Sequence, residues 1–163
     1  MEKRYELRWI WLLVMAATVG FIWQQSTVAP EISAETSDTV TEVIVPLVGG
    51  PTSLLGAFVE RFMRKIAHFV EFFVLGLEAG MFLRGRYTVL ATSLFLLLGI
   101  AVATADECIQ IFTRRGPAVT DVLIDLSGYA FALLISFGMS RLIPLVYKKW
   151  KERARDGADE RNA

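Results

Sequence analysis

The sequence predicts an all-α protein, a polytopic bundle that crosses a membrane four times. Hydrophobic residues make up 54% of the 163 positions, and the mean hydropathy is +0.47. These residues gather in long runs that are nearly free of charge, and about 20 consecutive apolar residues suffice to span a bilayer. The expected transmembrane helices cover about 9–29, 54–83, 87–113 and 118–147. We therefore expect one membrane domain over residues 1–147 and a polar cytoplasmic tail over 148–163.

The first helix follows a charged head and carries tryptophans near both ends, as an aromatic belt would place them. We find no signal-peptide cleavage pattern after it, so we expect it to remain as an anchor. The acidic, Ser- and Thr-rich stretch from Glu31 to Asp38 is typical of a solvated loop. Residues 39–48 are apolar but too short to span, which favours an interfacial or re-entrant segment that caps the bundle.

The remaining three helices have recognisable boundaries. Thr52 or Ser53 can cap the second helix, and Arg84-Gly85-Arg86 forms a basic turn into the third. Residues 87–105 are apolar and end at a pair of acidic residues. On the fourth helix the spacing of small residues predicts a close approach to a neighbouring helix. These small residues are Gly128, Ala132, Ser136 and Ser140.

The distribution of positive charge predicts that both termini are cytoplasmic. In that orientation twelve of the 17 Lys and Arg residues lie inside, which satisfies the positive-inside rule. The other side keeps five: Arg61, Arg64, Lys65, Arg114 and Arg115. Because the formal net charge is zero, the composition gives no reason to expect nucleic-acid binding. Cys108 is the only cysteine, which excludes an intramolecular disulfide and a thiolate metal cluster.

Ionisable residues enter the apolar runs at three places. On the second helix, Arg64, His68, Glu71 and Glu78 share one stripe, because residues three and four apart lie on the same face. A charged side chain deep in a bilayer costs roughly 2.5–3.5 kcal/mol, so this stripe must meet partners on other helices. The end of the third helix and the start of the fourth supply them: Asp106, Glu107, Gln110, Arg114, Arg115, Asp121 and Asp125. The predicted topology brings all three groups together near the extracytoplasmic surface.

These residues suggest three kinds of chemistry. Arg64, Arg114 and Arg115, with Lys65, could hold a phosphate or carboxylate. His68 could act as a general base with Glu71 or Asp125 as its partner. A metal site is a weaker alternative, since its candidate ligands come from three helices and match no metal-binding signature. These ligands are His68, Glu71, Asp106 and Asp125. We leave the metal and any cofactor unknown. For Lys65, a side chain that snorkels to the interface is the simpler interpretation, and the whole network could also serve only to lock the bundle.

Three segments of the sequence resemble the motifs of the VanZ-like family of integral membrane proteins. They are Arg64-Lys65-x-Ala67-His68-Phe69-x-Glu71-Phe72, Asp106-Glu107-x-x-Gln110-x-Phe112-x-x-Arg115 and Asp121-Val122-Leu123-Ile124-Asp125-x-x-Gly128. Ser26, Ser33 and Ser37 echo the serine-bearing loop of that family. Phe72 stands where the family usually has tyrosine, and Thr-Arg-Arg-Gly-Pro replaces its commoner Pro-Gly-Arg loop.

The resemblance implies a link to low-level resistance to teicoplanin, a glycopeptide with a fatty-acyl chain. We therefore expect a multi-pass protein of the bacterial cytoplasmic membrane with an extracytoplasmic polar pocket. Its expected ligand is an anionic amphiphile of the envelope, either a lipid-linked intermediate or a lipoglycopeptide. Two alternatives stay open: a membrane-embedded hydrolase or transferase that uses His68 as base on a lipid-linked substrate, and a structural scaffold.

Overall fold

The computed structural model describes residues 3–28, 30–113 and 119–159, and these residues form five helices without a strand. The helices are α1 (Lys3–Thr27), α2 (Pro30–Leu47), α3 (Leu54–Leu83), α4 (Val89–Phe112) and α5 (Val119–Asp159). Four of them contain stretches long and apolar enough to cross a membrane: Trp9–Thr27, Phe62–Leu83, Val89–Phe112 and Val119–Arg153. The prediction of an all-α polytopic bundle is confirmed.

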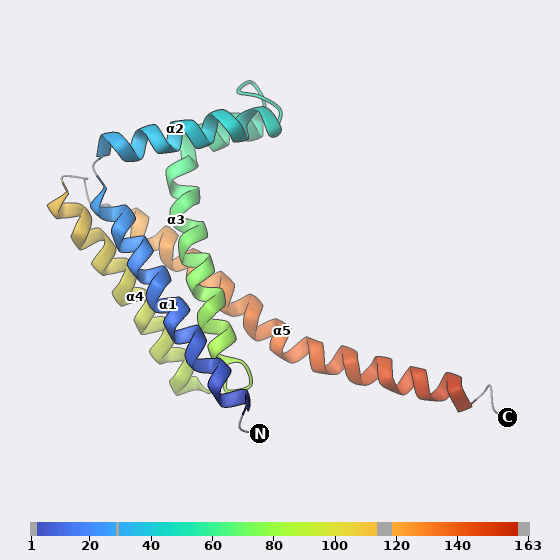
Figure 1. Ribbon diagram of the computed structural model, residues 1–163. Coiled ribbons are helices and arrows are strands. Elements are labelled where there is room, and N and C mark those ends of the chain that lie inside the picture. The colour runs from blue at the N-terminus through green and yellow to red at the C-terminus, as the bar shows by residue number, and fades with distance from the viewer. Residues whose placement is uncertain (1–2, 29, 114–118, 160–163) are drawn as a thin grey trace.

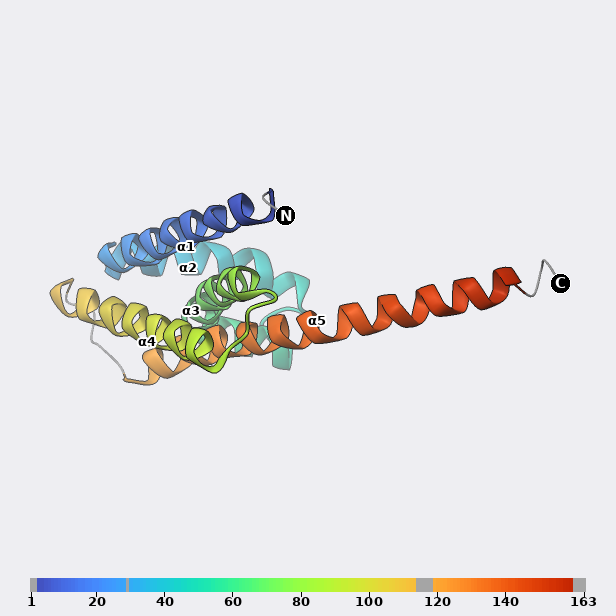
Figure 2. The ribbon, with the colours of Figure 1, turned by 90° about the horizontal axis from the view of Figure 1, so that it is seen from below.

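Helix α3 lies at the centre of the bundle and contacts each of the other four helices. Helices α1 and α4 run alongside it, whereas α2 lies across one end of the bundle (Figure 1). Helix α5 packs against α3 along its first half and then projects far from the other helices (Figure 2). The end covered by α2 is also where α4 finishes and α5 begins. The ionisable residues in the last turns of α4 and the first turns of α5 therefore lie at that end.

The contact between α3 and α5 depends on small residues. A Cβ atom added to Gly76 would clash with the backbone carbonyl oxygen of Tyr129, and one added to Gly128 would clash with the carbonyl oxygen of Phe69. One turn after Gly76, a Cβ atom added to Gly80 would clash in the same way with the side chain of Ser136. Without side chains at these points the two backbones come together, as expected for helices packed in a membrane. Three of the small residues that the sequence predicted on the fourth spanning helix, Gly128, Ala132 and Ser136, thus contact α3.

The stretch between the first two spanning helices differs from our expectation. We predicted a solvated loop from Glu31 to Asp38, but Pro30–Leu47 is one continuous helix, so that prediction is wrong. Proline is well suited to the first position of a helix because its φ angle is already helical. Acidic residues near the N-terminus of a helix are stabilised by the helix dipole. Gly49 and Gly50, with φ angles of 104° and 82°, then turn the chain into α3. Ser53 caps α3 as predicted, its Oγ accepting from the Gly56 amide at 2.9 Å.

The last helix is also longer than expected. We predicted its end near Tyr147, but α5 continues to Asp159 in spite of Pro144. The added turns are rich in Lys, Arg and Glu, which are good helix formers, and Lys148 and Glu152 form an ion pair at 3.9 Å along one face. The division into a membrane domain and a polar tail therefore stays a prediction, with no change of secondary structure at the proposed boundary.

Candidate functional site

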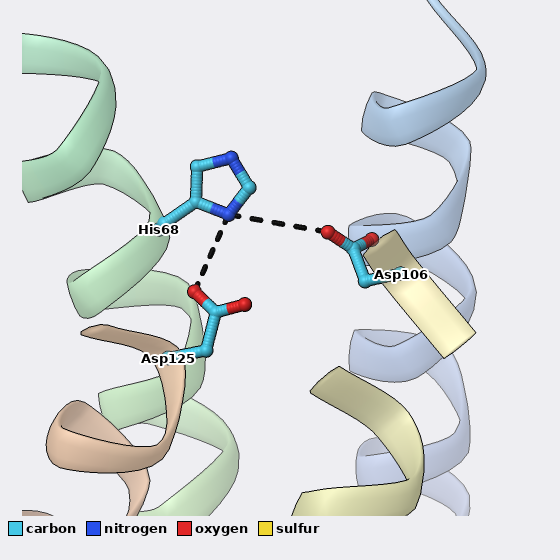
Figure 3. Close-up of side chains that lie close together, drawn as sticks. All are labelled: His68, Asp106 and Asp125. Atoms are coloured by element: carbon cyan, nitrogen blue, oxygen red, sulfur yellow. Dashed lines mark ion pairs between the residues drawn. The ribbon is translucent and has the colours of Figure 1, made fainter. Parts of the chain in front are cut away.

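Three ionisable side chains from three helices meet at the end of the bundle near α2. They are His68 on α3, Asp106 on α4 and Asp125 on α5, and their side chains point toward one another (Figure 3). The Nδ1 atom of His68 lies 3.3 Å from Oδ1 of Asp125 and 4.0 Å from Oδ2 of Asp106. Both aspartates are fully buried, and His68 is 9% exposed. We call these three residues the His-Asp-Asp cluster.

Helix packing places His68 opposite Asp125. Phe69 directly follows His68, and its carbonyl oxygen is the atom that approaches Gly128, one turn after Asp125. A close contact of the two backbones therefore lies beside the cluster. Since both residues are on regular helices, the distance between their side chains is fixed by the crossing point and not by a loop.

Asp106 is held by hydrogen bonds on both of its carboxylate oxygens. Ser26 of α1 donates to Oδ1 at 2.5 Å, and Gln110, one turn along α4, donates from Nε2 to Oδ2 at 2.9 Å. The amide oxygen of Gln110 accepts in turn from Nη2 of Arg64 at 3.2 Å. This chain of bonds connects the exposed guanidinium of Arg64 to the buried Asp106. It fixes the orientation of the carboxylate toward His68.

Asp125 is bonded very differently. Neither of its carboxylate oxygens has a hydrogen-bond partner among the residues that the structure describes, although the side chain is fully buried. His68 Nδ1 lacks one as well, and its contact with Asp125 at 3.3 Å is an ion pair when the imidazole is protonated. Glu71, half-buried one turn after His68, is close enough to interact electrostatically with the three members of the cluster. Buried polar atoms in native proteins rarely go without a partner, so these oxygens call for an explanation.

The other predicted site residues lie around the cluster or apart from it. Lys65 forms an ion pair with Asp121 at 3.6 Å, with 44% and 17% of the two side chains exposed. Such a pair contributes little to stability, which is consistent with a peripheral position. Glu107 is buried on α4. Arg114 and Arg115 fall outside the described residues, so their predicted role in holding an anion stays a prediction.

Glu78 belongs to the same stripe of α3 but not to the cluster. It lies ten residues after His68, which is about 15 Å further along a helix. Its Oε1 atom accepts a hydrogen bond from Thr18 of α1 at 2.8 Å. Glu78 thus takes part in the contact between α1 and α3, and Thr18 is the partner that we did not identify from the sequence.

Ser26 is the main residue of the site to which the sequence analysis assigned no role. It is buried at the end of α1 and reaches Asp106. A signal was present: Met15, Ile22 and Ser26 follow one another at intervals of seven and four residues, which places them on one helix face. All three are buried in the structure. A polar residue that continues a buried apolar face is a candidate partner for a buried charge.

The cluster offers two chemical capabilities. An imidazole that faces a carboxylate can exchange protons with a bound molecule. One imidazole nitrogen and carboxylate oxygens are also metal ligands, and the three candidate ligand atoms of His68, Asp106 and Asp125 all lie within 4.8 Å of one another. Arg64 adds a cation at the exposed margin of the site. An imidazole, carboxylates and a cation are the main groups that a site for a charged headgroup needs.

A model of the family described as VanZ/LLP1 matches residues 9–144, which include all four spanning stretches up to the middle of α5. No curated protein and no solved structure matches the chain significantly. The matched region contains every residue of the cluster and of the bonds that support it.

Proposed function

Because the chain belongs to the VanZ/LLP1 family and has four helices able to cross a membrane, we propose that it recognises the anionic headgroup of a cell-envelope amphiphile. The headgroup would bind where α2 covers the end of the bundle, with Arg64 as its first contact. We place this site at the outer surface of the bacterial cytoplasmic membrane, as the distribution of Lys and Arg predicts. The acyl or prenyl chain of the amphiphile would remain among the lipids beside the helices.

The observation that carries this proposal is the support of Arg64. Its guanidinium is exposed, yet one nitrogen is bonded to Gln110, which is itself bonded to the buried Asp106. A guanidinium has five N–H donors, so a single bond to Gln110 leaves donors for a phosphate or carboxylate. A preoriented arginine loses less freedom on binding than one that moves in solvent.

Two classes of ligand fit this chemistry. A lipid-linked intermediate of cell-wall synthesis carries an anionic phosphate headgroup and an apolar chain, and a lipoglycopeptide carries a carboxylate and an acyl chain. Either would place its charge near Arg64 and its chain in the bilayer. Low-level resistance to teicoplanin is the phenotype that the second ligand would produce.

A second candidate function is hydrolysis or group transfer on a lipid-linked envelope substrate. It is favoured by His68, whose Nδ1 faces two buried carboxylates (Figure 3). Carboxylates in that position orient an imidazole, so that its other nitrogen can accept a proton from a nucleophile such as water. In this reaction His68 would be the base, Asp125 would orient it, and Arg64 would bind the headgroup.

One experiment distinguishes the functions. The protein is purified from bacterial membranes, its bound lipids are identified by mass spectrometry, and the enriched lipid is then incubated with fresh protein. We expect enrichment of an anionic amphiphile by wild type, loss of that enrichment in Arg64→Gln, and no loss in Arg153→Gln, which changes an exposed arginine on the far part of α5.

The outcomes separate as follows. Lipid retained without conversion supports recognition, whereas turnover that disappears in both His68→Ala and Asp125→Asn supports the enzyme. Bound lipid of the same composition as the surrounding membrane, with thermal stability as the only property changed in the variants, would contradict both and leave a structural scaffold.

A further inference from the structure

We propose that His68, Asp106 and Asp125 bind one divalent cation of the Zn²⁺ or Mn²⁺ class. The ligand atoms would be Nδ1 of His68, Oδ2 of Asp106 and one carboxylate oxygen of Asp125. This inference rests on the geometry, burial and charge of the cluster itself. It does not depend on which headgroup, if any, the protein recognises.

The distances fit an ion at the centre of the cluster. Two ligand atoms that are each about 2.1 Å from a common ion can be at most about 4.2 Å apart. The separations from His68 Nδ1 are 3.3 Å to Asp125 and 4.0 Å to Asp106, and no pair among the three exceeds 4.8 Å. Ligands at tetrahedral positions around such an ion lie about 3.4 Å apart, so the carboxylates would move closer together on ligation. The dashed lines of Figure 3 converge on the same nitrogen from two directions.

Within the part of the chain that the structure describes, several buried polar atoms of the cluster lack hydrogen bonds, as is expected of atoms that bind an ion. A carboxylate that is buried and makes no hydrogen bond is unusual, and both oxygens of Asp125 are in that state among the described residues. Nδ1 of His68 faces them, also without a hydrogen bond. Coordination to an ion would give a partner to Nδ1 of His68 and to one oxygen of Asp125 at once.

A divalent ion would also balance the charges of two ionised carboxylates. Asp106 and Asp125 are both fully buried, and a protonated His68 would balance only one of the two carboxylates. Among the described residues, no Lys or Arg forms an ion pair with either aspartate. A buried charge without a counter-charge is costly, more so in a bilayer. One divalent cation neutralises both carboxylates.

The surroundings of Asp106 have the features of an outer shell of ligands. Ser26 and Gln110 hold its two oxygens in place, as hydrogen-bonded partners orient the ligating carboxylates of metal proteins. The protein supplies three ligands, which leaves coordination positions for water or for an oxygen of a bound molecule. The mixed nitrogen and oxygen set suits Zn²⁺ and Mn²⁺ better than Ca²⁺, which prefers oxygen ligands only.

The test uses the full chain in detergent, stripped with EDTA and titrated with MnCl₂ or ZnCl₂ while bound metal is counted after desalting. We expect one ion per chain for wild type. Ser26→Ala should weaken binding by the roughly 10–100-fold that an outer-shell partner is worth, and Asp125→Asn should weaken it further. Asp38→Asn, the same substitution at an exposed position of α2, is the matched control and should bind as wild type does.

A spectroscopic measurement identifies the nitrogen ligand. Electron spin-echo spectra of the Mn²⁺-loaded protein should show modulation from an imidazole ¹⁴N nucleus, and His68→Gln should remove that modulation even where some Mn²⁺ remains bound. A substitution that only destabilises the protein would leave this modulation in the spectrum. The proposal is overturned if stripped wild type binds neither ion stoichiometrically, or if Asp125→Asn and Asp38→Asn, both shown to be folded by circular dichroism, bind with equal affinity.

Discussion

His68 faces Asp125 across the crossing of α3 and α5, with Nδ1 of the histidine 3.3 Å from Oδ1 of the aspartate. The two backbones come close beside this pair, at the carbonyl of Phe69, one residue after His68, and at Gly128, three residues after Asp125. The polar pair thus lies beside a close contact between the two helices. Packing of this kind holds side chains near the positions in which they bind, which is the property that preorganised sites share.

The first prediction concerns the stability of Asp125→Asn with and without metal. In EDTA the two buried carboxylates repel each other, so removal of one charge should leave the protein as stable as wild type or more stable. In saturating Mn²⁺ the order should reverse, because an ion present at 100 times its Kd stabilises the folded protein by about 2.7 kcal/mol. Thermal denaturation in detergent, followed by circular dichroism, measures both conditions.

Asp38→Asn is the control for that comparison, because its side chain is exposed on α2. It should follow wild type in EDTA and in Mn²⁺. The same order of stability for wild type and Asp125→Asn in both conditions would show that the ion does not bind through this carboxylate.

The second prediction concerns the glycines between α3 and α5. An alanine at Gly128 would place its methyl group against the backbone of Phe69, and one at Gly76 would do so against Tyr129. Since backbone atoms cannot move aside easily, we expect each substitution to cost about 1–3 kcal/mol. Unfolding in a denaturing detergent such as SDS gives the change in free energy.

The matched substitution is Gly138→Ala, where an added Cβ meets no atom within 4 Å. Alanine is the better helix former, so this variant should be more stable by up to about 1 kcal/mol. An equal effect of all three substitutions would mean that helix propensity, and not the close approach, governs these positions.

The spanning helices of this fold could be predicted because the bilayer imposes a length and a composition on each of them. The amphipathic helix α2 could not, since an acidic, hydroxyl-rich sequence is typical of loops when its tertiary contacts are unknown. Its contacts with α3, together with Pro30 as its first residue, favour the helix. The same limit explains α5, whose charged extension past Tyr147 is as compatible with a frayed tail as with a helix.

The site shows a similar division. His68, Asp106 and Asp125 could be proposed together because charges inside three apolar runs must find one another. Their bonds could not be predicted, because these depend on how far each helix is rotated. Among the described residues Arg64 bonds to Gln110 and not to a carboxylate, while Ser26 reaches Asp106 from a helix that the charge pattern did not include. A hydroxyl on a buried face carries a weaker signal than a charge does.

The third prediction tests the bond from Ser26 to Asp106. Ser26→Ala leaves Oδ1 of a fully buried carboxylate without its donor, which should cost about 1–3 kcal/mol. The control is Ser127→Ala on α5, because Ser127 is exposed and its Oγ only donates to the carbonyl of Ile124 in its own helix. Its change should lie within about 0.5 kcal/mol, as for most surface substitutions. Equal losses in the two variants, measured by unfolding in SDS, would show that the bond adds nothing.

The fourth prediction fixes the side of the membrane on which the cluster lies. Helix α2 covers the cluster end of the bundle, and the polar half of α5 extends from the other end (Figure 1). If both termini are cytoplasmic, a cysteine at Asp38 of α2 faces outward and one at Glu152 of α5 faces inward. Cys108 is exposed, so both variants need a Cys108→Ala background. A membrane-impermeant maleimide should then label Asp38→Cys in intact cells and Glu152→Cys only after permeabilisation, whereas the opposite pattern would place the cluster at the cytoplasmic surface, out of reach of an extracytoplasmic ligand.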